Sequence, residues 1–120
     1  MAVSLTLFTT QCFAGKCPKP EVLAPCKCII FHKTDFQIHC DTDETVDIKK
    51  ILTKASEDSD VVNTIFQLNI KSAKITEFPE EATGKLKFSG VFIDVKSLQR
   101  IHSKAFASSK DTMKNFCFGN

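Results

Sequence analysis

The chain has 120 residues, a length that suits one compact domain. Hydrophobic residues make up 42% and charged residues 25%, proportions that are typical of a globular protein and exclude a disordered chain or a fibrous rod. The formal net charge is only +2 and no long run of Lys or Arg occurs, so nothing indicates nucleic-acid binding or a basic membrane-binding segment. Six cysteines in so short a chain indicate disulfides and an oxidising compartment.

Residues 1–15 predict a secretory signal peptide. They carry no charged side chain, they are too short and too polar to span a bilayer, and a small-residue site at 12–14 precedes Gly15. The alternative is a disordered or strand-like start. Cleavage would remove Cys12, and no later stretch is apolar enough to predict a membrane span. We therefore expect a secreted, extracellular protein.

Four of the cysteines lie within residues 16–41. Cys26 and Cys28 are separated by one residue, and an extended chain holds the Cβ atoms of such a pair too far apart for a disulfide, so each should bond a more distant cysteine. Two connectivities then remain. One joins Cys17 to Cys28 and Cys26 to Cys40, and the other joins Cys17 to Cys26 and Cys28 to Cys40.

The histidines do not indicate a metal site or a catalytic centre. His32 and His39 fall between the cysteines, but they do not complete the paired spacings of structural zinc sites. They fit better as polar residues of a hairpin in which 28–31 pairs with 36–40. No phosphate-binding glycine loop, nucleophile elbow or zinc-protease motif occurs. The sequence therefore predicts no enzyme, no catalytic residue, no metal and no cofactor.

Residues 42–60 predict one short helix followed by an acidic loop. Ile48, Ile51, Leu52 and Ala55 recur at helical spacing, and acidic side chains near the first turn complement the helix dipole. Residues 56–60 should be a solvated loop, and their spacing lacks the ligands of an EF-hand calcium site.

Residues 61–120 follow a longer apolar period. Similar units begin at Ile65, Phe88 and Met113, which are 23 and 25 residues apart. This pattern resembles the leucine-rich repeat family, L-x-x-L-x-L-x-x-N/C-x-L, with Ala73 and Lys96 where an Asn or Cys normally stands. The resemblance implies an α/β repeat fold, a short solenoid of two to two and a half repeats within residues 61–120.

The cysteine pattern also looks like the N-terminal cap that precedes extracellular leucine-rich repeats. That resemblance implies that residues 16–41 form a disulfide-stapled cap hairpin with the bonds Cys17–Cys28 and Cys26–Cys40. The order of cysteine motifs, acidic helix and Phe-rich units is similar to that of secreted arthropod proteins labelled non-catalytic subunit of the Oplophorus luciferase. This likeness implies a partner-binding subunit without light-emitting chemistry.

In a solenoid of this family, strand residues between the buried positions line a concave face. We expect Phe92 to be exposed there as a binding anchor, beside an ion pair of Lys71 with Asp94. A register shift of one residue would instead bury Phe92 and expose Ile93. The predicted partner-binding residues are Gln67, Asn69, Lys71, Phe92 and Asp94.

The solenoid is expected to be truncated at its C-terminus, because so few repeats leave an apolar edge open at Phe116 and Phe118. A homodimer through this C-terminal edge, or a link through Cys117, would cover it. The predicted function is a secreted, non-enzymatic protein-binding module or accessory subunit whose partner is a protein. The alternative is a small disulfide-stapled effector, a toxin or protease inhibitor that uses the hairpin of residues 28–40 as its reactive loop.

Overall fold

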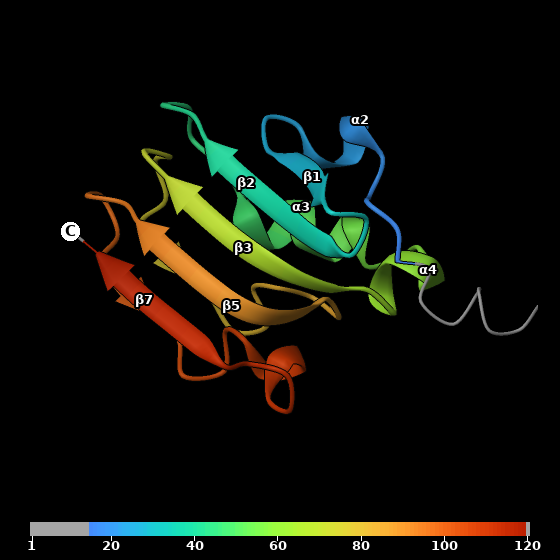
Figure 1. The fold of residues 1–120 in the computed structure, drawn as a ribbon. Coiled ribbons are helices and arrows are strands. Elements are labelled where there is room, and N and C mark those ends of the chain that lie inside the picture. Colours follow the sequence, from blue (N-terminus) through green and yellow to red (C-terminus); the bar gives the residue numbers. More distant parts are fainter. Residues whose placement is uncertain (1–14, 120) are drawn as a thin grey trace, which may run out of the picture.

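Five strands form one mixed sheet within residues 15–119, the part of the chain that the computed structural model describes (Figure 1). The strand order is β1-β2-β3-β5-β7, with β1 antiparallel to β2 and every other neighbouring pair parallel. The predicted signal peptide and Cys12 lie outside the described residues. The strands are β1 (Lys27–Phe31), β2 (Asp35–Asp41), β3 (Ile65–Lys71), β5 (Lys87–Asp94) and β7 (Asn115–Gly119).

The segments that connect the strands pack on one face of this sheet. Helix α3 lies behind β2 and β3 in Figure 1, and no element among the described residues covers the opposite face. Two short strands, β4 and β6, pair in parallel as a second small sheet. These connecting elements are α2 (Pro20–Leu23), α3 (Ile48–Ala55), α4 (Ser59–Val62), β4 (Glu77–Phe78), β6 (Arg100–Ile101) and the 3-10 helix η1 (Ala107–Ser109).

Helix α3 is the helix that the sequence predicts. The Asp47 side chain caps it by accepting the Lys50 N–H at 3.1 Å, and Leu52 on its inner face is fully buried. An acidic loop is expected at residues 56–60, after α3, but it ends where α4 begins at Ser59. Asp58 accepts the Asp60 N–H at 2.9 Å and so caps a second helix, α4.

Phenylalanine fills the core between the sheet and its connections. The rings of Phe36, Phe66 and Phe88 come from three adjacent strands and contact one another in sequence, with centroids 6.1 Å apart in each pair. Phe106 belongs to a second aromatic group, with its ring centroid 5.6 Å from that of Phe78 and 5.5 Å from that of Phe116. The inward residues of β2, β3 and β5 are Phe36, Ile38, Cys40, Phe66, Leu68, Ile70, Phe88, Val91 and Ile93, and all are buried.

Two disulfides tie the N-terminal segment to the hairpin of β1 and β2. The bonds are Cys17–Cys28 and Cys26–Cys40, across sequence separations of 11 and 14 residues. This is the pairing that the family resemblance implies. Loops of this size contribute about 3 kcal/mol each in the chain-entropy model. The bonds therefore supply a substantial share of the stability of so small a domain.

Serine and threonine hydroxyls of the later connections satisfy backbone groups that lie earlier in the chain. The Ser97 Oγ accepts the Ile75 N–H at 3.1 Å and donates to the Ile75 carbonyl at 3.0 Å. The Ser109 Oγ accepts the Phe88 N–H at 2.8 Å, and the Thr112 hydroxyl donates to the Phe88 carbonyl at 2.9 Å. Within the described residues, every buried side-chain nitrogen and oxygen has a hydrogen-bond partner. Backbone groups at Ile75 and at Phe88 of β5 therefore depend on hydroxyls from later in the chain.

The predicted leucine-rich repeat solenoid is wrong. The chain folds instead as a small α/β domain with one mixed sheet of five strands, and β2 of the disulfide-bonded hairpin pairs directly with β3 in that sheet. The connections do not repeat one conformation, since two helices, then β4, then β6 with η1 follow successive strands. The apolar period identified buried strand positions, but apolar spacing does not determine the conformation of connecting segments.

We expect Ser109→Ala to lower the free energy of unfolding by about 1–3 kcal/mol, because it removes the acceptor of the buried Phe88 N–H. Urea denaturation measures the change. Ser103→Ala is the matched control, because Ser103 is exposed and should change stability by less than about 0.5 kcal/mol. Equal effects of the two substitutions would show that the Ser109 hydroxyl is dispensable.

Candidate functional site

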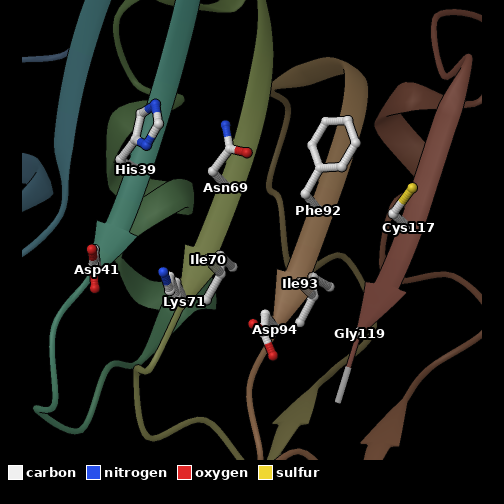
Figure 2. A pocket seen from close by; sticks show the side chains of 10 residues that line it. All are labelled: His39, Asp41, Asn69, Ile70, Lys71, Phe92, Ile93, Asp94, Cys117 and Gly119. Carbon is white, nitrogen blue, oxygen red and sulfur yellow. The ribbon is translucent and has the colours of Figure 1, made fainter.

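The uncovered side of the main sheet, here called the open face, carries the outward side chains of four parallel strands. Because register partners in a sheet point to the same side, these side chains form rows across the strands. The outward residues of β2, β3, β5 and β7 are Gln37, His39, Asp41, Gln67, Asn69, Lys71, Phe92, Asp94, Asn115 and Cys117, and Gly119 completes the row of Asp94. The row at the middle of the face runs from His39 through Asn69 and Phe92 to Cys117 (Figure 2).

Phe92 lies at the centre of the open face. It is partly exposed, whereas Ile93 is buried, so the strand has the register that places Phe92 outward. A Cβ atom at Gly90 would lie 3.1 Å from Cε2 of the Phe92 ring, a close approach that a larger residue would crowd. Gly90 therefore gives this ring room to lie along its own strand.

A shallow hollow of about 380 Å³ surrounds Phe92 on this face (Figure 2). Of the predicted binding residues, Asn69, Lys71, Phe92 and Asp94 line it. Gln67 belongs to the neighbouring row, where it pairs with Gln37 and Gly90, and it lies outside this lining. The fold thus brings the predicted residues onto one face and gathers most of them around one apolar ring.

The predicted ion pair of Lys71 with Asp94 is not formed. The two residues are register partners, yet the ion pairs within residues 15–119 are Lys16–Asp58 and Arg100–Glu77. Asp41 is the register partner of Lys71 on its other side. This row therefore presents two carboxylates and an ammonium group that are free to contact a partner.

His39 is a residue of this face that the sequence-based site omitted. Its Nε2 lies 2.8 Å from Gln37 Oε1, and Gln37 Nε2 donates to the Asp35 carboxylate at 3.0 Å. Since the Gln37 oxygen must then accept, His39 Nε2 carries the donated proton, and Nδ1 is free of this hydrogen bond. The alternation of buried and outward residues along 36–40 could have placed His39 on the open face.

Nothing in the geometry of the open face indicates catalysis. Cys117 has an exposed free thiol, but β3 and β5 separate its strand from that of His39, which places the two roughly 14 Å apart. A nucleophile needs a base within hydrogen-bond reach. Within residues 15–119, no three His, Cys, Asp or Glu side chains are placed to hold a metal ion.

Comparisons with known proteins found no matching family model, no matching curated protein and no matching solved structure. The likeness to proteins labelled as a luciferase subunit therefore stays a prediction. Among the described helices, none has the length and apolar character needed to cross a bilayer.

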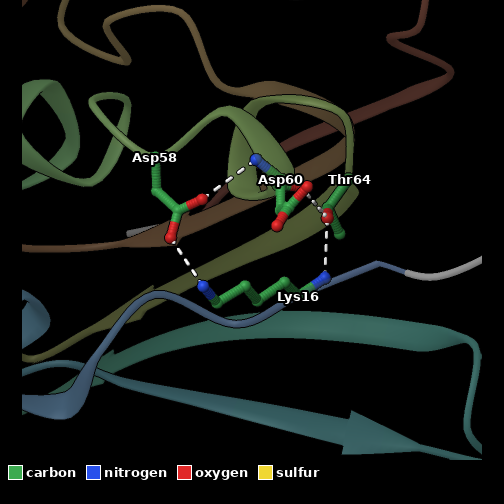
Figure 3. A network of polar contacts seen from close by, with 4 residues as sticks. All are labelled: Lys16, Asp58, Asp60 and Thr64. Carbon is green, nitrogen blue, oxygen red and sulfur yellow. Dashed lines mark hydrogen bonds and ion pairs between the residues drawn. The ribbon is translucent and has the colours of Figure 1, made fainter.

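The clearest charge interaction lies away from the open face, where the N-terminal segment meets α4 (Figure 3). The Lys16 ammonium is 2.8 Å from Asp58 Oδ2, and the Lys16 backbone N–H donates to the Thr64 hydroxyl at 2.8 Å. The hydrogen bond with Asp58 raises the pKa of Lys16, and the same bond lowers the pKa of Asp58. These shifts have a structural cause, an exposed ion pair that holds the chain next to α4.

This ion pair predicts an acid-dependent change in stability. Because the folded-state pKa of Asp58 is lowered, its contribution is present above the ordinary aspartate pKa of about 3.9 and is lost as pH falls below that value. Asp58→Asn should therefore lower the melting temperature at neutral pH. Well below the ordinary aspartate pKa of about 3.9, the variant and the unchanged protein should melt at similar temperatures. Thermal melts across this range measure the difference. Asp60→Asn is the control, and the same pH-dependent loss in that variant would contradict a specific role of Asp58.

Proposed function

We propose that this chain is a secreted, non-enzymatic binding module or accessory subunit that recognises a protein partner through the open face. The observation that carries the proposal is a partly exposed aromatic ring, Phe92, set in a hollow between polar and charged side chains. Aromatic anchors in such positions commonly supply much of the energy of a protein interface.

The surroundings of Phe92 suit a protein ligand. Asn69 offers both hydrogen-bond donors and acceptors, while Lys71 and Asp94 offer charges that are not paired with each other. All of these residues stand on strands of one sheet whose other side is the core. A surface on regular strands is ordered before binding, so little conformational entropy is lost when a partner docks.

The extracellular part of the proposal is supported by the cysteine chemistry. Two disulfides in a domain of this size are consistent with an oxidising environment and are uncommon in the cytosol. The signal peptide expected in residues 1–15 would direct the chain there.

Selection of binders from a displayed random-peptide library tests the role of the open face. We expect the selected peptides to bind Phe92→Ala at least about tenfold more weakly than the unchanged protein, because truncation removes the apolar anchor. Biolayer interferometry measures the affinities. Peptides that bind Phe92→Ala and the unchanged protein equally would overturn the proposal.

Lys33→Ala is the matched control and tests the alternative function. Lys33 lies at the exposed tip of the β1–β2 hairpin, with a backbone φ of 67°, in the loop that an effector would present. Binding should be unchanged in this variant. Loss of binding in Lys33→Ala with retention in Phe92→Ala would favour the effector function instead.

We also propose that two copies pair along β7. Phe116 and Phe118 are 45% and 53% exposed, and the exposed thiol of Cys117 lies between them at the centre of the strand. An antiparallel pair centred on Cys117 would place Phe116 of one copy opposite Phe118 of the other. Residues opposite each other in an antiparallel sheet have Cα atoms about 5.5 Å or less apart, close enough for a disulfide.

Light scattering coupled to gel filtration tests the dimer. We expect a dimer at high micromolar concentration, and we expect Phe118→Lys to favour the monomer because two buried charges would face the apolar edge. A non-reducing gel should show a Cys117-dependent band that is absent in Cys117→Ser. Lys33→Ala serves as control, and a monomeric mass for the unchanged protein would refute the pairing.

A further inference from the structure

The side of the molecule away from the open face carries a groove rich in lysine. Its main part is a hollow of about 810 Å³ lined by Lys49 of α3 and by Lys85 and Lys87 near the start of β5. An adjoining hollow of about 480 Å³ shares Lys49 and adds Lys50 and Lys54. These five lysines define what is here called the basic groove.

The fold brings together lysines that are far apart in the sequence. The inner face of α3 is buried, so its lysines point away from the core. The turn before β5 reaches the end of α3 through Gly84, whose φ is +60° and whose Cβ position lies only 2.6 Å from Ser56 Oγ. The Lys85 N–H then donates to the same Ser56 hydroxyl at 2.9 Å. This contact sets Lys85 and Lys87 alongside Lys49.

The ammonium groups of the basic groove have no ion-pair partner within residues 15–119. Three carboxylates border the groove, those of Asp47, Glu57 and Glu81. Asp47 caps α3 and so faces the helix N-terminus, where its charge is partly compensated. The positive side chains outnumber the negative ones, and the groove attracts anions.

We propose that the basic groove binds a sulfated polysaccharide of the extracellular matrix or cell surface. The lysines are spread over two adjoining hollows, so a polymer with repeated negative groups can contact several of them, whereas a single small anion cannot. No aromatic side chain lines either hollow, and single-stranded nucleic acid would need such rings for base stacking. Most residues that line the two hollows have polar or charged side chains, which disfavours insertion into a lipid surface.

Fluorescently labelled heparin is the probe for this test, with the full chain at about 0.15 M NaCl, near physiological ionic strength. The triple variant Lys49→Gln, Lys85→Gln and Lys87→Gln should weaken binding at least about tenfold, because three direct contacts with sulfate groups are lost and counterion release falls with them. The slope of log affinity against log salt should also fall by about 2 to 3.

A variant with the same change in net charge is the control. It carries Lys27→Gln, Lys33→Gln and Lys96→Gln, three exposed positions outside the groove, and it should bind heparin within about threefold of the unchanged protein. Circular dichroism checks that both variants are folded. Equal weakening in the two variants would show that only overall charge matters and would overturn the proposal.

Two further arms separate the ligand classes. Desulfated heparin should not bind, and binding as tight as that of heparin would refute recognition of sulfate. Single-stranded RNA that binds more tightly than heparin would assign the groove to nucleic acid instead. Since Phe92→Ala should leave heparin binding unchanged, failure of the groove and failure of the open-face proposal are distinguishable.

Discussion

Burial of one face of the sheet is the constraint on which the rest of the structure depends. Phe36, Phe66 and Phe88 fix three neighbouring strands against the same core. A shift of one residue in the strand register would move these rings to the solvent-exposed face. The alternate residues are thereby forced outward in register. Core packing thus places the row that contains Phe92 and the charged row beside it. No loop is needed to position these side chains.

Features that depend on local spacing could be predicted from the sequence. Helix α3 follows from apolar residues at helical intervals. For Phe92 the sequence left two registers open, because apolar residues flank it on both sides, and the burial of Ile93 decides between them. The hairpin of β1 and β2 follows from two apolar runs around a turn. The two bonded pairs of cysteines needed a family resemblance, because spacing alone left two connectivities.

The features that could not be predicted depend on contacts between distant segments. The same apolar period is compatible with connections of several conformations, so the repeat spacing misled the fold prediction although it located buried strand positions. The free charges of Lys71 and Asp94 depend on side-chain placement, which adjacency in a register does not determine. The basic groove requires the approach of Gly84 to Ser56, which no sequence pattern around either residue indicates.

The hydroxyl bonds between connections also bear on how the chain folds. Each parallel strand pairs with the next one along the chain, Phe36 with Phe66, Phe66 with Phe88 and Val91 with Phe116. The loops closed in this way are all short relative to the chain, so each step has a modest entropic cost. Ser109 completes the backbone of Phe88 only after the following segment has arrived. Loss of the segment that leads into β7 would therefore leave the Phe88 N–H and carbonyl of β5 without these partners.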